Sequence, residues 1–192
     1  VSLPGIKFDE EKIVSSTGAL SLKKVPKKLV IVGGGYIGLE MGSVWSRLGS
    51  EVQVVEFLDH ITPGMDKEIS SEFQKLLKKQ GINFNLKTKV ETISKNKDGV
   101  VVDTTDDQGN KKKFDCDVVL VSVGRKPNTN KLNLEKIGVE KDQKGRIKVN
   151  NRFQTNIKNI YAIGDVIEGP MLAHKAEDCL LYTSPSPRDV SR

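Results

Sequence analysis

Three consecutive glycines directly after a short apolar run constrain the fold of this chain more than any other feature. The run Leu29-Val30-Ile31-Val32 is short and β-branched, which is typical of a parallel strand buried on both faces. Gly33 to Gly38 follows, and residues 36–48 carry apolar side chains near helical spacing. A second short strand, residues 52–55, ends at Glu56. Strand, helix and strand within about 30 residues predict a βαβ unit with a right-handed crossover.

The spacing of these glycines is typical of a turn that binds the pyrophosphate of a dinucleotide. Glycines at 33, 35 and 38 fit G-x-G-x-x-G, directly after a strand and at the start of a helix. Gly33 permits the tight turn, Gly35 lets the backbone approach a pyrophosphate, and Gly38 allows close packing of helix on strand. The helix N-terminus offers N–H groups and a partial positive charge to phosphates. We predict a dinucleotide site; the alternative is a merely tight strand–helix turn.

Glu56 indicates which nicotinamide cofactor the site would take. It ends the second strand about 20 residues after the glycines, where an acid binds the adenosine ribose hydroxyls. An acid there repels a 2′-phosphate, and no arginine follows within residues 57–60. This favours NAD over NADP, although an ordinary carboxylate at a strand end is the alternative interpretation.

The rest of the chain predicts further α/β structure interrupted by a β-hairpin. Residues 1 to about 22 carry turn-forming residues and are predicted to be irregular. After Gly145, short strand and turn segments are expected to lead to Gly164-Asp165, whose acid could hold a ribose or ribityl hydroxyl or could belong to a turn. Between these regions the pattern predicts a helix at residues 66–80, with Ile69, Phe73, Leu76 and Leu77 on one face. Five strands are predicted to follow, at residues 82–84, 89–93 and 100–104, as a short strand near Phe114, and at residues 117–121, where Gly124 closes the last one.

Composition excludes several classes of protein. No apolar run approaches the roughly 20 residues of a membrane span. Two cysteines, Cys116 and Cys179, cannot form a disulfide framework, and with two histidines they leave little room for a metal site, so none is predicted. The net charge of +6 comes from lysines spread along the chain among acids, and aromatic residues are only 5%. We interpret these lysines as solvated surface and expect neither a nucleic-acid partner nor a membrane partner.

Several stretches together resemble a known family. The chain is similar to the flavin-dependent pyridine nucleotide-disulfide oxidoreductases, in particular to the enzymes that act on lipoamide. The Thr155 to Asp165 pattern is a flavin signature of that superfamily, and the run from Gly169 to Ala176 narrows the resemblance to the lipoamide enzymes. The similarity extends over about residues 1–178. The stretches that carry it are residues 15–20, 33–40, 123–129 and 155–178.

The resemblance implies a domain organisation and a set of site residues. It implies a Rossmann-like NAD-binding domain at residues 24–145 with a β-hairpin insertion, flanked by partial segments of a FAD-binding domain at 1–23 and 146–178. Residues 179–192 depart from the family pattern, with a Ser-Pro-Ser-Pro stretch, and are expected to be a non-native disordered tail. The implied NAD residues are Gly33, Gly34, Gly35, Tyr36, Ile37, Gly38, Leu39, Glu40, Glu56, Val90 and Gly124. The implied FAD residues are Asp165, Met171, Leu172, Ala173 and His174.

By the same resemblance, the parent enzyme oxidises protein-bound dihydrolipoamide and reduces NAD. Its partners would be lipoyl domains of 2-oxo acid dehydrogenase complexes and a second copy of the chain. Its location would be the mitochondrial matrix in a eukaryote or the cytoplasm in a bacterium. The redox cysteine pair and the catalytic histidine of the family match no residue here, so no catalytic residue is assigned and the chain is expected to be an inactive piece of a longer protein. A glutathione or mercuric reductase type of enzyme and a non-catalytic nucleotide-binding module are the alternatives.

Overall fold

The chain divides into two compact units. The computed structural model describes residues 1–183, with side chains to residue 178. The first unit spans Val1–Gly124, and the second begins at Arg125. Residues 125–145, which the sequence assigned to the NAD-binding domain, therefore lie in the second unit. Residues 1–23, which it assigned to a flavin segment, lie in the first.

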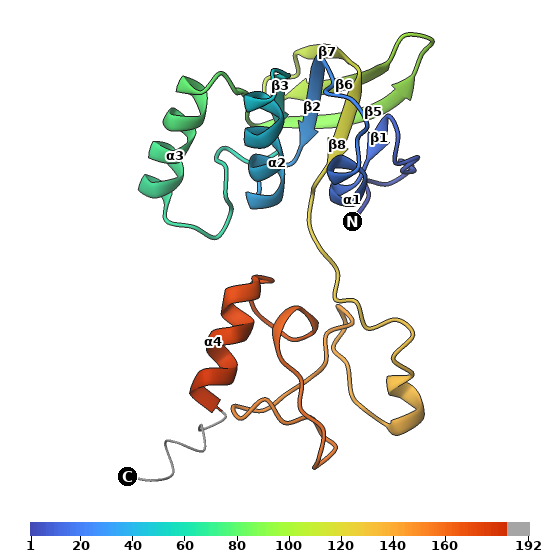
Figure 1. The fold of residues 1–192 in the computed structure, drawn as a ribbon, viewed down its shortest axis with the longest axis vertical. Coiled ribbons are helices and arrows are strands. Elements are labelled where there is room, and N and C mark those ends of the chain that lie inside the picture. The colour runs from blue at the N-terminus through green and yellow to red at the C-terminus, as the bar shows by residue number, and fades with distance from the viewer. Residues whose placement is uncertain (184–192) are drawn as a thin grey trace. The chain divides into compact units, whose positions relative to one another are not determined.

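A five-stranded parallel sheet organises the first unit (Figure 1). Its order is β1-β8-β2-β3-β4, and every neighbouring pair is parallel. The chain leaves β2 toward β3 on one side, while β8 pairs on the other side, so the strand order reverses at β2. Ligands of open α/β sheets bind at the carboxyl edge of such a point. The strands are β1 (Ile13–Val14), β2 (Lys28–Val32), β3 (Glu51–Val55), β4 (Asn83–Asn85) and β8 (Val118–Val121).

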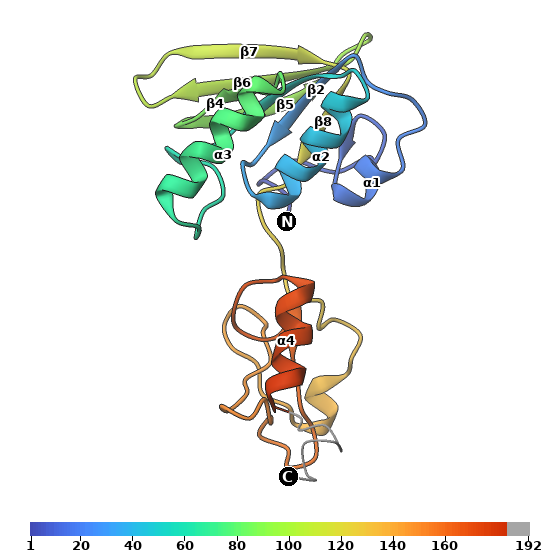
Figure 2. The ribbon, with the colours of Figure 1, turned by 60° about the vertical axis from the view of Figure 1, so that its left-hand side comes forward.

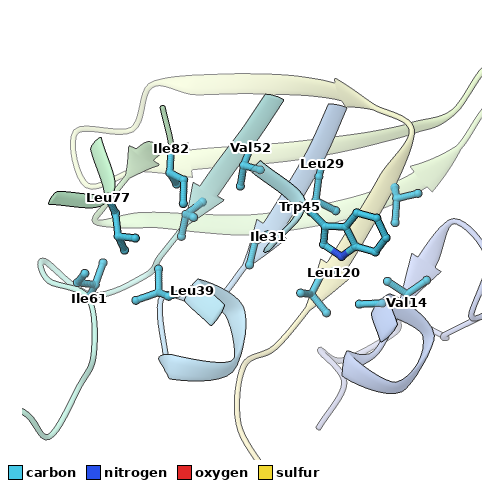
Figure 3. Close-up of a cluster of buried hydrophobic side chains, with 13 residues drawn as sticks. Val14, Leu29, Ile31, Leu39, Trp45, Val52, Ile61, Leu77, Ile82 and Leu120 are labelled. Carbon is cyan, nitrogen blue, oxygen red and sulfur yellow. The ribbon is translucent and has the colours of Figure 1, made fainter. Parts of the chain in front are cut away.

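Helices cover one face of this sheet. They are α1 (Ser16–Leu20), α2 (Tyr36–Arg47) and α3 (Lys67–Lys79). Leu39 and Trp45 of α2 pack with Ile31 and Leu120 of the strands, as Figure 3 shows. The helix predicted at residues 36–48 is thus confirmed, and Gly49 follows its end at φ +104°.

A three-stranded antiparallel sheet covers the other face (Figure 2). It consists of β5 (Thr88–Lys95), β6 (Val100–Asp106) and β7 (Lys111–Cys116). Val30 and Val32 of β2 pack with Val102 and Phe114 of the antiparallel sheet, whereas Leu29 and Ile31 face the helices. The prediction that β2 is buried on both faces is confirmed. The last strand of the insertion is longer than the short strand predicted near Phe114.

The apolar face predicted for α3 is only partly buried. Asp66 caps this helix by accepting hydrogen bonds from the N–H groups of Glu68 and Ile69 at 2.9 and 3.2 Å. Leu77 is buried, but Ile69 and Leu76 are more than half exposed and Phe73 is 38% exposed. Ser70 is buried instead, where its hydroxyl meets that of Thr62 at 2.8 Å. The helix therefore touches the sheet along a narrower stripe than its periodicity predicts.

The prediction that residues 1–22 are irregular holds for residues 1–12 and is wrong for residues 13–20, which contain β1 and α1. Ile13 and Val14 form β1, in register with Val119 and Leu120 of β8. A strand of two residues depends on its partner strand, so it leaves no periodicity in the sequence. Ser15, one of the turn-forming residues in this stretch, caps α1, because its hydroxyl accepts a hydrogen bond from the N–H of Thr17 at 3.2 Å.

The second unit contains little regular structure around a small core of its own. Its elements are the short 3-10 helices η1 (Leu134–Ile137) and η2 (Gly164–Val166) and the helix α4 (Ala173–Thr183). The short strands predicted after Gly145 are present only as isolated bridges, Lys141 with Ile147 and Gln154 with Tyr161. The buried core side chains are Leu134, Val139, Ile147, Ala162 and Ile167.

The tail predicted to be disordered from residue 179 begins as helix. The helix α4 continues through residue 179 and ends at Thr183, two residues before Pro185, which cannot continue a helix. The first five residues of the predicted tail are therefore helical, and the rest lie outside the described residues. Within residues 1–183, no helix is long and apolar enough to cross a membrane.

Gly38→Ala tests how closely α2 approaches the sheet. A methyl group on Gly38 would lie 2.4 Å from the Gly33 carbonyl oxygen and 2.6 Å from the Ser122 hydroxyl. We expect a loss of about 1–3 kcal/mol in the free energy of unfolding, measured in urea, because a backbone atom has to move. Gly42→Ala is the matched control: it gains the same helix propensity, but its methyl group would contact side chains alone, the nearest being the flexible end of Ile31 at 2.8 Å. Equal stability of the two variants would contradict this packing.

Candidate functional site

The glycine turn lies at the carboxyl edge of the parallel sheet. Gly33 has φ +109°, and its N–H donates to the carbonyl of Val55 at 2.9 Å. A methyl group on Gly33 would lie 2.6 Å from the backbone oxygen of Ser122. Both the left-handed conformation and the contact with the end of β8 therefore require glycine. The predicted roles of Gly33 in the turn and Gly38 in helix packing agree with this geometry.

Open space lies beside the N-terminus of α2. Gly35 is the N-cap residue, with φ −76° and ψ 171°, and no side chain caps the helix there. A methyl group on Gly35 would meet nothing within 4 Å. The open position coincides with the positive end of a 12-residue helix, which is the place where a phosphate binds best. The residues present therefore fit the pyrophosphate of a dinucleotide.

The Glu56 carboxylate is fixed beside the glycine turn. Its Oε2 accepts a hydrogen bond from the N–H of Gly34 at 2.5 Å, and its Oε1 accepts one from the N–H of Leu58 at 2.8 Å. Glu56 is only 8% exposed. A carboxylate can accept about four hydrogen bonds, so acceptor capacity remains for ribose hydroxyls. Glu56 therefore also holds the glycine turn in place, whereas the sequence predicted only that it binds the ribose hydroxyls.

Two residues that the sequence did not single out hold the same turn. Ser122 follows β8, and its hydroxyl lies 3.2 Å from the carbonyl oxygen of Val32 and 3.4 Å from that of Gly33. The backbone N–H of Thr62 donates to the carbonyl of Gly34 at 2.8 Å. The position of Ser122 directly after a buried strand was the available signal, since parallel strands end at one edge.

The other residues predicted on α2 differ in their access to a ligand. Tyr36 and Glu40 are exposed in the first turns of the helix, and Ile37 is half-buried. Leu39 is 1% exposed, and its N–H donates to the carbonyl of Gly35 at 3.1 Å. Leu39 therefore belongs to the core, with neither side chain nor N–H directed to a ligand.

The last two residues predicted for the NAD site lie on different elements. Val90, on β5, is half-buried and packs with the core beneath the antiparallel sheet. Gly124 comes two residues after Ser122, has φ +137°, and would leave an added methyl group without a neighbour within 4 Å. An open left-handed glycine near the carboxyl end of β8 fits close approach of a ligand to the backbone.

The residues predicted for the flavin lie at η2 and at the start of α4. Gly164, with φ +72°, lets these elements approach, since a methyl group on it would lie 3.1 Å from Cβ of Ala176. Asp165 is ion-paired through Oδ2 with Arg125 at 2.6 Å. Leu172 is half-buried, and His174 is exposed at the start of α4. Met171, also half-buried, and Ala173, which is exposed, complete the predicted group.

Cys116 is sequestered in the core of the first unit. It is 5% exposed, and its thiol lies 3.5 Å from the carbonyl oxygen of Val100. Burial raises the pKa of the Cys116 thiol to about 12. Because the thiolate is the reactive form, this cysteine is inert at neutral pH.

The fold and the glycine turn define a dinucleotide-binding α/β protein. Residues 1–178 match the family described as pyridine nucleotide-disulphide oxidoreductase. The chain belongs to this family, whose members use FAD together with NAD or NADP. The predicted resemblance, fold class and pair of cofactors are thereby confirmed at the level of the family.

Several relatives share about three fifths of its residues. The mitochondrial dihydrolipoyl dehydrogenase of Pisum sativum is 61% identical over 178 residues, which are 92% of this chain and 36% of the pea protein. The mitochondrial dihydrolipoyl dehydrogenase of Mus musculus is 60% identical, over 91% of this chain and 35% of its own length. A leghemoglobin reductase of Glycine max is 60% identical, over 92% of this chain and 34% of its own length. The chain thus spans about a third of the length of these relatives.

Solved structures agree with the fold. The Cu(II) complex of the HOCl-induced flavoprotein disulfide reductase RclA from Escherichia coli has a TM-score of 0.80 at 31% identity, over 93% of this chain and 41% of RclA. LpdA from Mycobacterium tuberculosis has a TM-score of 0.80 at 26% identity, over 93% of this chain and 38% of LpdA.

Alkylation measures how completely Cys116 is sequestered. With a thiol pKa of about 12, the thiolate fraction at pH 8 is about 10⁻⁴, and burial hinders the reagent further. We expect iodoacetamide to modify Cys116 at least about 100-fold more slowly in the folded chain than in urea, as followed by peptide mass spectrometry. Equal rates in the two states would show that the cysteine is accessible.

Proposed function

We propose that this chain contributes the NAD-binding domain and one side of the flavin site to a dihydrolipoyl dehydrogenase. The enzyme would oxidise protein-bound dihydrolipoamide and reduce NAD. Two mitochondrial enzymes of that name, from pea and mouse, are 61% and 60% identical to it over 178 residues. The match extends across both the glycine turn and the Asp165 to Asp178 region, so it includes both groups of predicted site residues.

One observation carries the NAD assignment: open space at Gly35 lies next to a carboxylate held in place at Glu56. The N–H groups at the start of α2 would bind the pyrophosphate, and Gly35 would let it approach. Glu56, fixed by the N–H groups of Gly34 and Leu58, would accept hydrogen bonds from the adenosine ribose. Its negative charge would repel the 2′-phosphate of NADP. Positioning of the nucleotide is thus the work of this unit.

The second unit would supply one side of the flavin site. When bound, FAD carries electrons between a dithiol and the nicotinamide. Oδ1 of Asp165 has no partner among residues 1–178, so it could accept a hydrogen bond from a hydroxyl of the flavin side chain. Residues 171–174 would pack along the ring system at the start of α4. Glu40, exposed on α2, would set local charge near the nicotinamide.

The proposed partners and location follow from the relatives. A dihydrolipoyl dehydrogenase would meet lipoyl domains of 2-oxo acid dehydrogenase complexes and would act as a homodimer. A mitochondrial matrix location is supported by the mitochondrial relatives from pea and mouse; a bacterial source would place the protein in the cytoplasm.

A second candidate activity is reduction of leghemoglobin. The soybean relative of that name is 60% identical, as close as the mouse enzyme. The two activities are separated by assaying the full-length protein with dihydrolipoamide and NAD, and with leghemoglobin and NADH. NADH formation from dihydrolipoamide would support the proposed function, and its absence would contradict it. Reductases of the glutathione or mercuric type are disfavoured by Glu56, which is poorly suited to NADP.

Glu56→Gln tests the basis of nucleotide selectivity. We expect the purified chain to bind NAD more tightly than NADP in calorimetric titrations. The variant should lower the ratio of the two affinities about tenfold, since it removes a charged acceptor and the repulsion of a 2′-phosphate. Glu51→Gln, at the opposite end of β3, is the control and should leave the ratio unchanged. Equal or tighter binding of NADP by the unmodified chain would contradict the argument.

The chain by itself should be catalytically silent. Electron transfer from dihydrolipoamide needs a dithiol, a flavin held from both sides and a base, and these groups act together. We expect no flavin absorbance in the purified protein and no dihydrolipoamide-dependent NADH formation above the buffer control. A yellow protein with measurable turnover would overturn the proposal that these residues form only part of the enzyme.

A further inference from the structure

The guanidinium of Arg125 contacts both segments that are predicted to face the flavin. Nη2 of Arg125 lies 2.6 Å from Oδ2 of Asp165, and Nη1 of Arg125 donates to the carbonyl oxygen of Met171 at 3.1 Å. Asp165 belongs to η2, and Met171 lies in the segment that leads into α4. Arg125 thus binds one residue from each of the two segments that would face the flavin.

We propose that Arg125 is a positioning residue of the flavin site, an inference that rests on the proposed function above. It holds the Asp165 carboxylate through one oxygen, so Oδ1 is left to accept a hydrogen bond from a flavin hydroxyl. It also fixes the Met171 carbonyl, and with it the start of α4. The ligand concerned is the polyhydroxyl side chain of a flavin nucleotide.

The geometry requires arginine rather than any cation. A planar guanidinium presents several N–H groups in fixed directions and can bind a carboxylate and a carbonyl at once. Lysine would keep the charge but carries a point-like ammonium on a flexible stem. Lys126, the next residue, is also exposed, and no ion pair joins it to the described side chains.

Because the Arg125–Asp165 ion pair is partly exposed, an effect of Arg125 on flavin binding can be distinguished from an effect on folding stability. The side chains of Arg125 and Asp165 are 43% and 35% exposed, and exposed ion pairs add little to folding stability. Removing Arg125 should therefore leave the melting temperature nearly unchanged. Ligand binding should respond more strongly, since a freely rotating carboxylate has to be ordered when the flavin binds.

The opposite role, in which Arg125 keeps the flavin away from the Asp165 carboxylate, would have the opposite effect on flavin affinity. If the guanidinium competed with the flavin for the carboxylate, removing it would strengthen flavin binding. A carboxylate accepts about four hydrogen bonds, and Arg125 contacts only one oxygen of Asp165. The geometry therefore favours support over competition.

The experiment measures FAD affinity in the full-length holoenzyme that contains this segment. The flavin is stripped, and the apoenzyme is titrated with FAD by fluorescence quenching for the unmodified protein, Arg125→Gln, Arg125→Lys, Asp165→Asn and the double variant Arg125→Gln with Asp165→Asn. Lys126→Gln is the matched control. Melting temperatures of all apoenzymes are measured in parallel.

We expect Arg125→Gln and Asp165→Asn each to weaken FAD binding about tenfold, and the double variant to lose less affinity than the two single losses combined, because both variants disturb the same carboxylate. Arg125→Lys should recover part of the loss, and Lys126→Gln should stay within about twofold of the unmodified protein. Unchanged or tighter binding in Arg125→Gln would overturn the inference, as would additive losses, or a fall of several degrees in melting temperature without rescue by lysine. Failure of the unmodified apoenzyme to bind FAD would instead refute the proposed function, and the inference with it.

Discussion

The contact between the start of α2 and the carboxyl edge of the sheet is the constraint on which the first unit depends. Gly33 and Gly38 both face Ser122, and a methyl group on either would lie 2.6 Å from an atom of that serine. Because neither carries a side chain, the helix begins directly above the reversal of strand order at β2. That contact brings the positive end of α2 to the edge where Glu56 follows β3. The geometry of the proposed dinucleotide site is therefore a consequence of how tightly helix and sheet pack.

Burial of the sheet on both faces makes the edge rigid. Leu29 and Ile31 face the helices, while Val30 and Val32 face the antiparallel sheet. Without the inserted strands β5 to β7, the valine side of β2 would be open to water. We infer that the insertion completes the core, since each covered apolar side chain adds roughly 1.5–3 kcal/mol. A strand held from both sides presents its terminal residues in one position, as a preorganised site requires.

Sequence reasoning succeeded where the structure follows the local pattern of residues. The glycine motif, β2 and Glu56 follow one another along the chain, so spacing alone located them. It failed where a distant partner creates the structure: β1 consists of two residues that are strand only because β8 lies beside them. Ser122, Thr62 and Leu58 were missed because their contacts come from folding rather than from residue type. The exposed side of α3 was missed because periodicity identifies an apolar face, not what covers it.

Each unit contains one carboxylate that is predicted to accept hydrogen bonds from ligand hydroxyls. Glu56 is anchored by backbone N–H groups and is 8% exposed, whereas Asp165 is anchored by the Arg125 guanidinium with its side chain 35% exposed. A buried carboxylate needs hydrogen bonds to remain charged, and backbone donors supply them without adding another mobile side chain. A more exposed carboxylate is compensated by water, so it needs to be oriented more than neutralised. The Arg125 guanidinium, which contacts Asp165 and Met171 at once, provides this orientation. Each anchor leaves acceptor capacity on the carboxylate, so in the proposed function both acids would meet ligand hydroxyls from positions that the protein already determines.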